Sequence, residues 1–249
     1  MPWELISDGA LDGATNMAID AALLEEIDRS STTRTIVRFY QWRRPTMSLG
    51  RNQKIEKAVD AEYCNANGID IVYRPTGGRA VLHDDELTYA VISNDSSCFG
   101  DTIYGNYKRV SEALCLGYRN LGIPAVLAPD TRKPDDWEND GDPPCFVSPS
   151  RYELMVEGRK VVGSAQRRVR NSFLQHGSMP ITFNYEVLAR ATRTRDRELL
   201  EREMAGLAEF VDSRPSQVQL REAFIHAFQT FFSIEFRLGT HPPVDPVVA

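Results

Sequence analysis

The residue types best suited to covalent chemistry in this 249-residue chain are Cys145 and Lys160. Cys145 ends an irregular, proline-rich segment, and Lys160 lies just past the predicted turn of a hairpin. The reactive form of cysteine is the thiolate, which a neighbouring ammonium stabilises. A nucleophilic cysteine also needs a group that binds the carbonyl it attacks, and one lysine could serve both purposes. Taken alone, the two residues fit a small buried cysteine and a solvated lysine equally well.

A second candidate feature is the glycine pair Gly77-Gly78, in the stretch Tyr-Arg-Pro-Thr-Gly-Gly-Arg-Ala-Val-Leu-His that ends at His83. The stretch follows a predicted strand, and two glycines let the backbone approach a ligand closely. It lacks the Gly-x-Gly-x-x-Gly and Gly-Lys-Ser/Thr patterns of phosphate-binding loops. A bare glycine pair also fits an ordinary tight turn, and His83 alone also fits a hydrogen-bonded structural histidine.

A third stretch reads Gly-Ser-Ala-Gln at 163–166 and leads to Leu-Gln-His-Gly-Ser at 174–178. Together the three stretches resemble the lipoate ligase and biotin ligase superfamily, and more closely its bacterial octanoyltransferases. Those enzymes carry an Arg-Pro-Thr-Gly-Gly-Arg-Ala-Val-Leu-His loop. They also carry a Cys-Phe-x-x-Pro-Ser-x-Tyr-Glu segment with a lysine fifteen positions after the cysteine, the interval that separates Cys145 from Lys160 here. The resemblance covers roughly residues 3–235.

The resemblance implies which residues form the site. Cys145 and Lys160 would be the catalytic pair, and His176 would have a structural role. Many ligases of the superfamily have a third glycine where this chain has Arg79, and this departure favours the transferases over the ATP-dependent ligases. No metal and no cofactor are implied. The residues expected to bind the acyl substrate are Arg74, Thr76, Gly77, Gly78, Arg79, His83, Gly163, Ser164 and Ala165.

The implied reaction is acyl transfer from octanoyl-acyl carrier protein, the donor. We expect the Cys145 thiolate to attack the donor thioester. A lysine of a lipoyl-carrying protein, such as the glycine cleavage H protein or a dehydrogenase E2 lipoyl domain, would then take the octanoyl group as an amide. Because an amide is more stable than a thioester, no ATP is needed.

Three alternatives stay open from the sequence. One is an ATP-dependent lipoate-protein ligase, and another is an amidotransferase that moves lipoyl or octanoyl groups between lipoyl domains. The third is a non-catalytic acyl-binding module in which the cysteine and lysine are incidental. An acyl group on Cys145 would exclude the first and third. Only the choice of donor separates the second.

The elements that must position these residues come in hairpin groups, which favours an α+β fold with a mixed, mostly antiparallel sheet flanked by helices. The resemblance implies the same biotin/lipoate ligase-like catalytic domain. Around a turn at Glu157-Gly158, Met155 would lie opposite Lys160, whose side chain would point away from the core beside Ser164 and Gln166. We predict helices at 14–29, 58–67 and 104–121, strands at 35–41, 46–50, 69–73, 86–93, 125–127, 151–156, 159–166 and 173–181, a loop at 129–144, and mostly helix beyond.

Composition sets the remaining limits. With 42% apolar and 26% charged residues, the chain reads as a globular protein with a single catalytic domain over 1–238 and a proline-rich tail over 239–249. The net charge of −6 argues against a nucleic-acid partner. The four cysteines form no Cys-x-x-Cys pair and no histidine stands at zinc-site spacing, so we expect a reducing compartment. The N-terminus lacks a signal-peptide pattern and no run reaches about 18 apolar residues, which predicts a cytoplasmic protein without a membrane partner.

Overall fold

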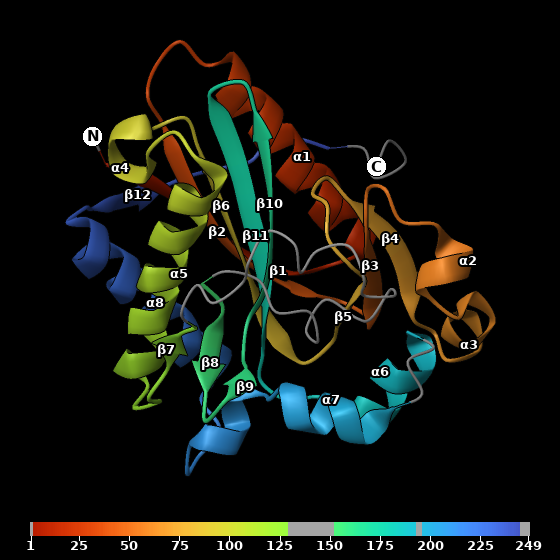
Figure 1. Ribbon diagram of the computed structural model, residues 1–249. Helices are drawn as coiled ribbons and strands as arrows, with labels where there is room; N and C mark the ends of the chain where they lie inside the picture. The colour runs from red at the N-terminus through yellow and green to blue at the C-terminus, as the bar shows by residue number, and fades with distance from the viewer. Residues whose placement is uncertain (1, 129–151, 193–195, 245–249) are drawn as a thin grey trace.

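The computed structural model describes residues 2–128, 152–192 and 196–244, and a six-stranded mixed sheet forms its centre (Figure 1). The strand order is β10-β11-β6-β2-β1-β12. Neighbours from β10 to β2 are antiparallel, whereas β1 runs parallel to both β2 and β12. The expected mixed, mostly antiparallel α+β fold is therefore confirmed. The bounds are β1 Trp3–Leu11, β2 Thr35–Trp42, β6 Glu86–Ser93, β10 Gly163–Val169, β11 Ser172–Pro180 and β12 Phe236–Leu238.

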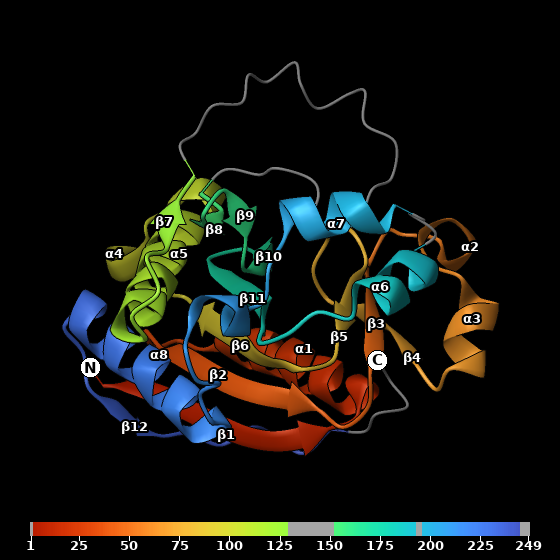
Figure 2. The ribbon, with the colours of Figure 1, turned by 90° about the horizontal axis from the view of Figure 1, so that it is seen from below.

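Helices cover both faces of this sheet, because its strands alternate apolar side chains between two cores. On β6, Tyr89 and Val91 belong to the core under α5 (Ile103–Asn120) and α8 (Gln217–Phe232). Ala90 and Ile92 belong to the opposite core, under α1 (Gly13–Arg29). Helices α5 and α8 lie side by side, well away from α1 (Figures 1 and 2).

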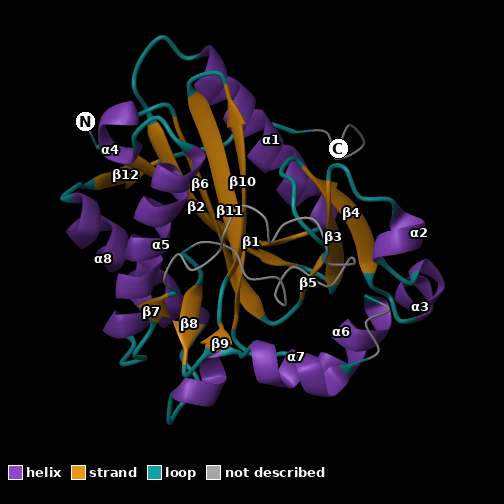
Figure 3. Ribbon diagram, viewed as in Figure 1, coloured by secondary structure: helices purple, strands orange, loops and turns teal. Residues whose placement is uncertain are grey.

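Two smaller sheets flank the central one, as the strand colouring shows (Figure 3). The first has the order β4-β3-β5 and packs with short helices around a separate apolar cluster. The second has the order β7-β8-β9 and lies beside α5. The remaining bounds are β3 Thr46–Gly50, β4 Asp70–Arg74, β5 Val81–His83, β7 Val126–Leu127, β8 Leu154–Val156, β9 Arg159–Lys160, α2 Ile55–Ala58, α3 Ala61–Ala66, α4 Ser96–Phe99, α6 Tyr185–Ala191, α7 Arg197–Glu203 and the 3₁₀ helix η2 Leu207–Phe210.

Most predicted elements are present, and β3 and β6 have the predicted bounds. The predicted helix 58–67 begins too early, because only α3 lies inside this range and Ala58 is the last residue of the separate helix α2. Val59 is extended between them, and the Asp60 side chain caps α3 by accepting from the backbone N–H of Tyr63. Strands β1, β5 and β12 and helix α4 were not predicted. The predicted loop 129–144 lies outside the described residues.

The predicted hairpin is confirmed at its turn and wrong in its length. Glu157 and Gly158 both have positive φ, and Met155 pairs with Lys160 as expected. The second strand ends at Lys160, because its carbonyl accepts from the Ala205 N–H at 3.0 Å and the chain then turns away to form β10. Lys160 and Ser164 thus belong to different sheets, and the Lys160 side chain is buried instead of pointing outward.

No helix in the described ranges is long and apolar enough to cross a membrane.

Candidate active site

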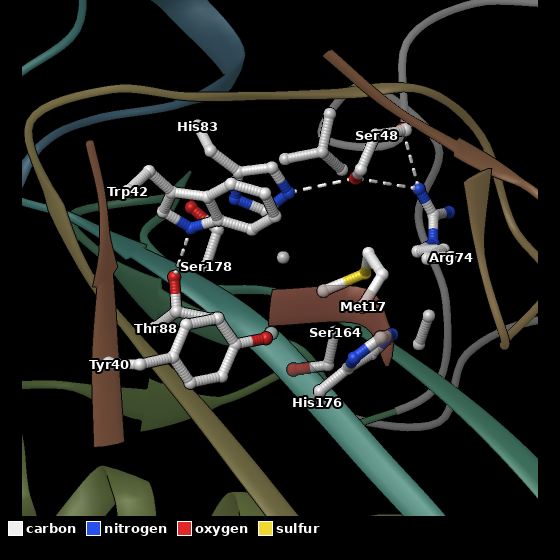
Figure 4. Close-up of a pocket in the computed structure, with 14 residues that line it drawn as sticks. Met17, Tyr40, Trp42, Ser48, Arg74, His83, Thr88, Ser164, His176 and Ser178 are labelled. Carbon is white, nitrogen blue, oxygen red and sulfur yellow. Dashed lines mark hydrogen bonds between the residues drawn. The ribbon is translucent and has the colours of Figure 1, made fainter. Parts of the chain in front are cut away.

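A pocket opens where the β4-β3-β5 sheet meets the central sheet (Figure 4). It encloses about 330 Å³ of empty space, part of it open to solvent. Five of the expected substrate-binding residues are among those that line it. The lining is Met17, Tyr40, Trp42, Ser48, Arg74, Val81, His83, Thr88, Gly163, Ser164, Ala165, His176, Gly177 and Ser178.

The other expected residues, 76–79, form the loop between β4 and β5 beside this pocket. Gly78 has φ +89°, where any other residue would be strained. A Cβ at this position would lie 2.9 Å from the Arg74 guanidinium and 3.8 Å from Cβ of Ala165. Gly78 therefore brings the loop backbone close to Arg74 and to the β10 wall.

Arg74 organises this loop from inside. Its side chain is only 5% exposed, and its guanidinium donates to the carbonyls of Gly77 at 2.8 Å and Arg79 at 2.7 Å. It also donates to the carbonyl of Ser48 on β3 at 2.8 Å. Arg74 thus joins the loop to the sheet beneath it, and its charge is directed at backbone oxygens.

Two histidines line the pocket, and each is paired with a buried carboxylate. His83 Nδ1 lies 2.9 Å from Glu86 Oε1, and the His83 ring stacks on Trp42 with 4.0 Å between centroids. His176 Nδ1 lies 2.8 Å from Asp20 Oδ2. Burial lowers the pKa of His176 more than its hydrogen bond to Asp20 raises it, so this imidazole is neutral. The structural role predicted for His176 agrees with these bonds.

The hydroxyl groups of the lining are bonded to the protein. Ser178 donates to Glu86 at 2.5 Å, Ser164 bonds Tyr89 at 2.7 Å, and Thr88 accepts from the Trp42 indole at 2.7 Å. A polar group that is already hydrogen-bonded to the protein does not need a hydrogen bond from a ligand. The pocket therefore suits an alkyl chain better than a phosphate or a sugar.

The β10–β11 wall depends on a close backbone approach. A Cβ on Gly177 would lie 2.5 Å from the carbonyl oxygen of Gly163 and 2.9 Å from the Ser164 hydroxyl. No side chain fits between β10 and β11 at this point. In the sequence, the only sign of this close approach is the glycine that follows His176.

Lys160 lies three residues before this wall, on β9, and makes a buried ion pair. Its Nζ is 2.5 Å from Oε1 of Glu153, and the two residues are 3% and 5% exposed. Glu153 follows Tyr152, which has the unusual φ of +59° for a non-glycine residue. The sequence placed Glu153 inside the cysteine motif but assigned it no role. The ion pair fixes the position of the Lys160 ammonium within the described residues.

Cys145 lies outside the described residues. The three cysteines within them are poor nucleophiles, because burial raises the pKa of Cys64 to about 11 and also raises the pKa of Cys98 and Cys115. Cys98 is half-buried in α4. Within the described residues, no group of three acidic, histidine or cysteine side chains could hold a metal ion.

Comparison with solved structures gives the class of this fold. A lipoate-protein ligase A bound with ATP superposes with a TM-score of 0.76 at 26% identity, over 96% of this chain and 89% of that one. A bi-partite lipoate protein ligase from Thermoplasma acidophilum superposes with a TM-score of 0.77 at 23% identity, over 96% and 87%. The chain therefore has the lipoate ligase fold.

The sequence comparisons are more specific. The family described as lipoyl protein ligase A/B catalytic domain matches residues 12–229, and the chain belongs to this family. A protein named octanoyltransferase LipM from Carboxydothermus hydrogenoformans is 38% identical over 94% of this chain and 88% of its own length. The protein of the same name from Bacillus subtilis is 37% identical over 93% and 87%.

Proposed function

We propose that this protein is an octanoyltransferase of lipoate biosynthesis that carries the acyl group on Cys145. The observation that carries the proposal is the pocket whose polar groups are all bonded to the protein, next to the strand that bears the buried Lys160–Glu153 pair. The lining suits an apolar chain, and Lys160 lies on β9, three residues before β10 of the pocket wall. The octanoyltransferase relatives support the same activity.

The reaction follows in two steps. The Cys145 thiolate attacks the thioester carbonyl of octanoyl-acyl carrier protein, a new C–S bond forms, and the carrier leaves as a thiolate. The amine of an acceptor lysine then attacks the acyl carbonyl, a C–N bond forms and the C–S bond to Cys145 breaks, and the amine proton passes to the departing Cys145 thiolate. The Lys160 ammonium stabilises the thiolate and the negative charge that develops on the carbonyl oxygen in both steps.

The pocket residues take the acyl chain. We assign the contacts to Arg74, His83, Gly163, Ser164 and Ala165 in the lining, with residues 76–79 as the loop that closes one side. The acceptor is a lipoyl-carrying protein, such as the glycine cleavage H protein or a dehydrogenase E2 lipoyl domain. The enzyme works in the cytoplasm as one catalytic domain over residues 1–238.

Intact-mass analysis tests the proposal. The purified protein is mixed with octanoyl-acyl carrier protein without ATP, and a mass increase of one octanoyl group on Cys145 is expected. Cys145→Ala should show neither the adduct nor transfer to a lipoyl domain, whereas Cys98→Ala should retain both. Turnover by the Cys145→Ala protein comparable to wild type would overturn the mechanism.

The same assay separates the alternatives. Transfer that requires ATP and free octanoate would identify a ligase. An adduct formed only from an octanoylated lipoyl domain would identify an amidotransferase. Reversible binding without an adduct would identify an acyl-binding module.

A further inference from the structure

We propose that His83 and His176 are positioning residues that set the width of the acyl pocket through two matching hydrogen-bond relays, both of which begin at Arg74. The hydrogen bonds of the two relays are present in the structure whether or not the protein transfers octanoyl groups. Their effect on acyl-chain preference rests on the proposed octanoyl transfer.

The first relay runs from the loop to helix α1. Arg74 Nε donates to Thr76 Oγ1 at 3.2 Å. Thr76 Oγ1 lies 2.8 Å from His176 Nε2, and His176 Nδ1 lies 2.8 Å from the Asp20 carboxylate. Thr76 and Asp20 are fully buried, so this relay is closed to water.

The second relay has the same order of groups. Arg74 Nη1 donates to Ser48 Oγ at 3.2 Å. Ser48 Oγ lies 2.8 Å from His83 Nε2, and His83 Nδ1 lies 2.9 Å from the Glu86 carboxylate. Guanidinium, hydroxyl, imidazole and carboxylate follow one another in both relays.

Arg74 and the carboxylates together fix the direction of both relays. A guanidinium has only donors, so the two hydroxyl groups next to it accept from it. At the far ends a carboxylate oxygen only accepts, so each Nδ1 carries a proton and donates it. In a neutral imidazole Nε2 then accepts the hydroxyl proton, and neither ring has a free nitrogen in the pocket.

The carboxylates anchor the far ends to the central sheet and α1. Asp20 also accepts from Arg38 at 2.8 Å and from Tyr40 at 2.9 Å. Burial raises the pKa of Asp20, but the hydrogen bond from His176 and the charge of Arg38 outweigh it, so the pKa is lowered and the group is ionised. Glu86 likewise accepts from Ser178 at 2.5 Å and from Thr88.

The relays therefore span the pocket between its two walls. Arg74, Ser48, His83 and the 76–79 loop belong to the β4-β3-β5 side, whereas His176, Asp20 and Glu86 belong to the central sheet and α1. The first relay crosses between the two sides at Thr76–His176 and the second at His83–Glu86. In Figure 4 His83 and His176 lie on opposite sides of the space, with Arg74 at one end. Because both relays cross between the same two walls, they fix the separation of those walls, which decides how tightly an alkyl chain is held.

The test removes one hydroxyl from each relay and leaves the histidines in place. Thr76→Val and Ser48→Ala each break one relay next to Arg74. The readout is the ratio of kcat/KM for octanoyl and hexanoyl donors, because a ratio measured within one variant does not depend on the fraction folded. Loss of one hydrogen bond should lower the ratio by about threefold or more, and Thr76→Ser should restore it.

Thr35→Val is the matched control, because the Thr35 hydroxyl is also buried in the central sheet, where it bonds Ser93 at 2.7 Å outside the pocket. It should leave the ratio unchanged. An unchanged ratio in both Thr76→Val and Ser48→Ala, with an active wild type, would overturn the positioning role. A fall in kcat alone, at a constant ratio, would instead assign the histidines to proton transfer and would also overturn it.

A second arm needs no activity. In protein with ¹⁵N-labelled histidine, the nitrogen shifts of His83 and His176 should both report the Nδ1–H tautomer. The Nε2–H tautomer at either ring would contradict the relays. If the wild-type protein fails to transfer octanoyl groups, the proposed function is wrong, but the nitrogen shifts still test whether the relays exist.

Discussion

The pocket between the two sheets and the β8–β9 hairpin hold their charged groups in different ways. In the pocket, the carboxylates Asp20 and Glu86 each accept from three donors drawn from several elements. On the hairpin, the Lys160 ammonium meets Glu153 within one short β-structure. The pocket charges tie walls together and are turned away from the ligand. The hairpin instead holds its ammonium in a single buried ion pair, on the strand that bears the proposed catalytic lysine. We therefore expect chemistry to depend on the hairpin and selectivity on the pocket.

The largest effect expected on the hairpin side is that of Lys160→Ala. Loss of a preorganised group that stabilises an oxyanion costs about 10²–10³ in kcat. We expect a fall of that size in octanoyl transfer, and alkylation of Cys145 by iodoacetamide should move to higher pH. If the alkylation profile and kcat both stayed at wild-type values, Lys160 would not belong to the reaction.

Two neighbouring ion pairs on the hairpin differ in burial, so their contributions to stability can be compared directly. Lys160–Glu153 is buried, whereas Arg159–Glu209, from the adjacent residue of β9, is 25% and 39% exposed with an N–O distance of 2.6 Å. Removing one partner of a buried pair costs about 3–5 kcal/mol, and removing one of an exposed pair costs about 1 kcal/mol or less. Urea unfolding should therefore show a much larger loss for Glu153→Gln than for Glu209→Gln. Equal losses would mean that burial of the Lys160 pair has no energetic consequence.

On the pocket side, shortening the donor should have a moderate effect. Each buried CH₂ contributes about 0.8 kcal/mol, so a hexanoyl donor should react roughly fifteenfold more slowly in kcat/KM than an octanoyl donor. Longer donors should also lose activity, because a pocket closed by packed side chains is costly to expand. Equal rates with octanoyl and palmitoyl donors would contradict a closed pocket.

The smallest effect concerns pH. The pKa of His176 is lowered by burial, so between about pH 6.5 and this lowered pKa the unfolded chain binds a proton that the folded chain does not. Stability should therefore fall with pH below about 6.5, with a slope of at most about 1.4 kcal/mol per pH unit from this group. Unfolding free energies between pH 7 and pH 5 should show a smaller slope in His176→Asn than in wild type. The same slope in both would exclude His176 as its source.

Local patterns were enough to predict much of the fold. The apolar periodicity of α1 and α5 and the β-rich runs of β2, β3 and β6 are visible in short windows of sequence. Strands β1 and β12 could not be predicted in this way, because they pair with each other across almost the whole chain. The hairpin was predicted too long because tertiary bonds, from Ala205 to Lys160 and from Tyr118 to Val161, redirect the strand.

The pocket residues that stand in local sequence motifs could be predicted, whereas those brought in by long-range packing could not. Arg74, His83 and Gly163 stand in recognisable motifs, and the structure brings them together. Met17 and Trp42 carry no local sign of a ligand site, and they line the pocket only because α1 and β2 pack against it. Glu153 gains its significance from the fold, which places it against Lys160.

The parallel pairing of β1 with β12 has a consequence for how the protein is made. Trp3 of β1 pairs with Phe236 of β12 and packs on Phe232, with 4.7 Å between the ring centroids. During synthesis β12 leaves the ribosome long after β1, so the outer edge of β1 stays unpaired until β12 emerges. An unpaired strand edge beside an uncovered aromatic core promotes aggregation. We therefore expect a chain truncated before β12 to accumulate in inclusion bodies.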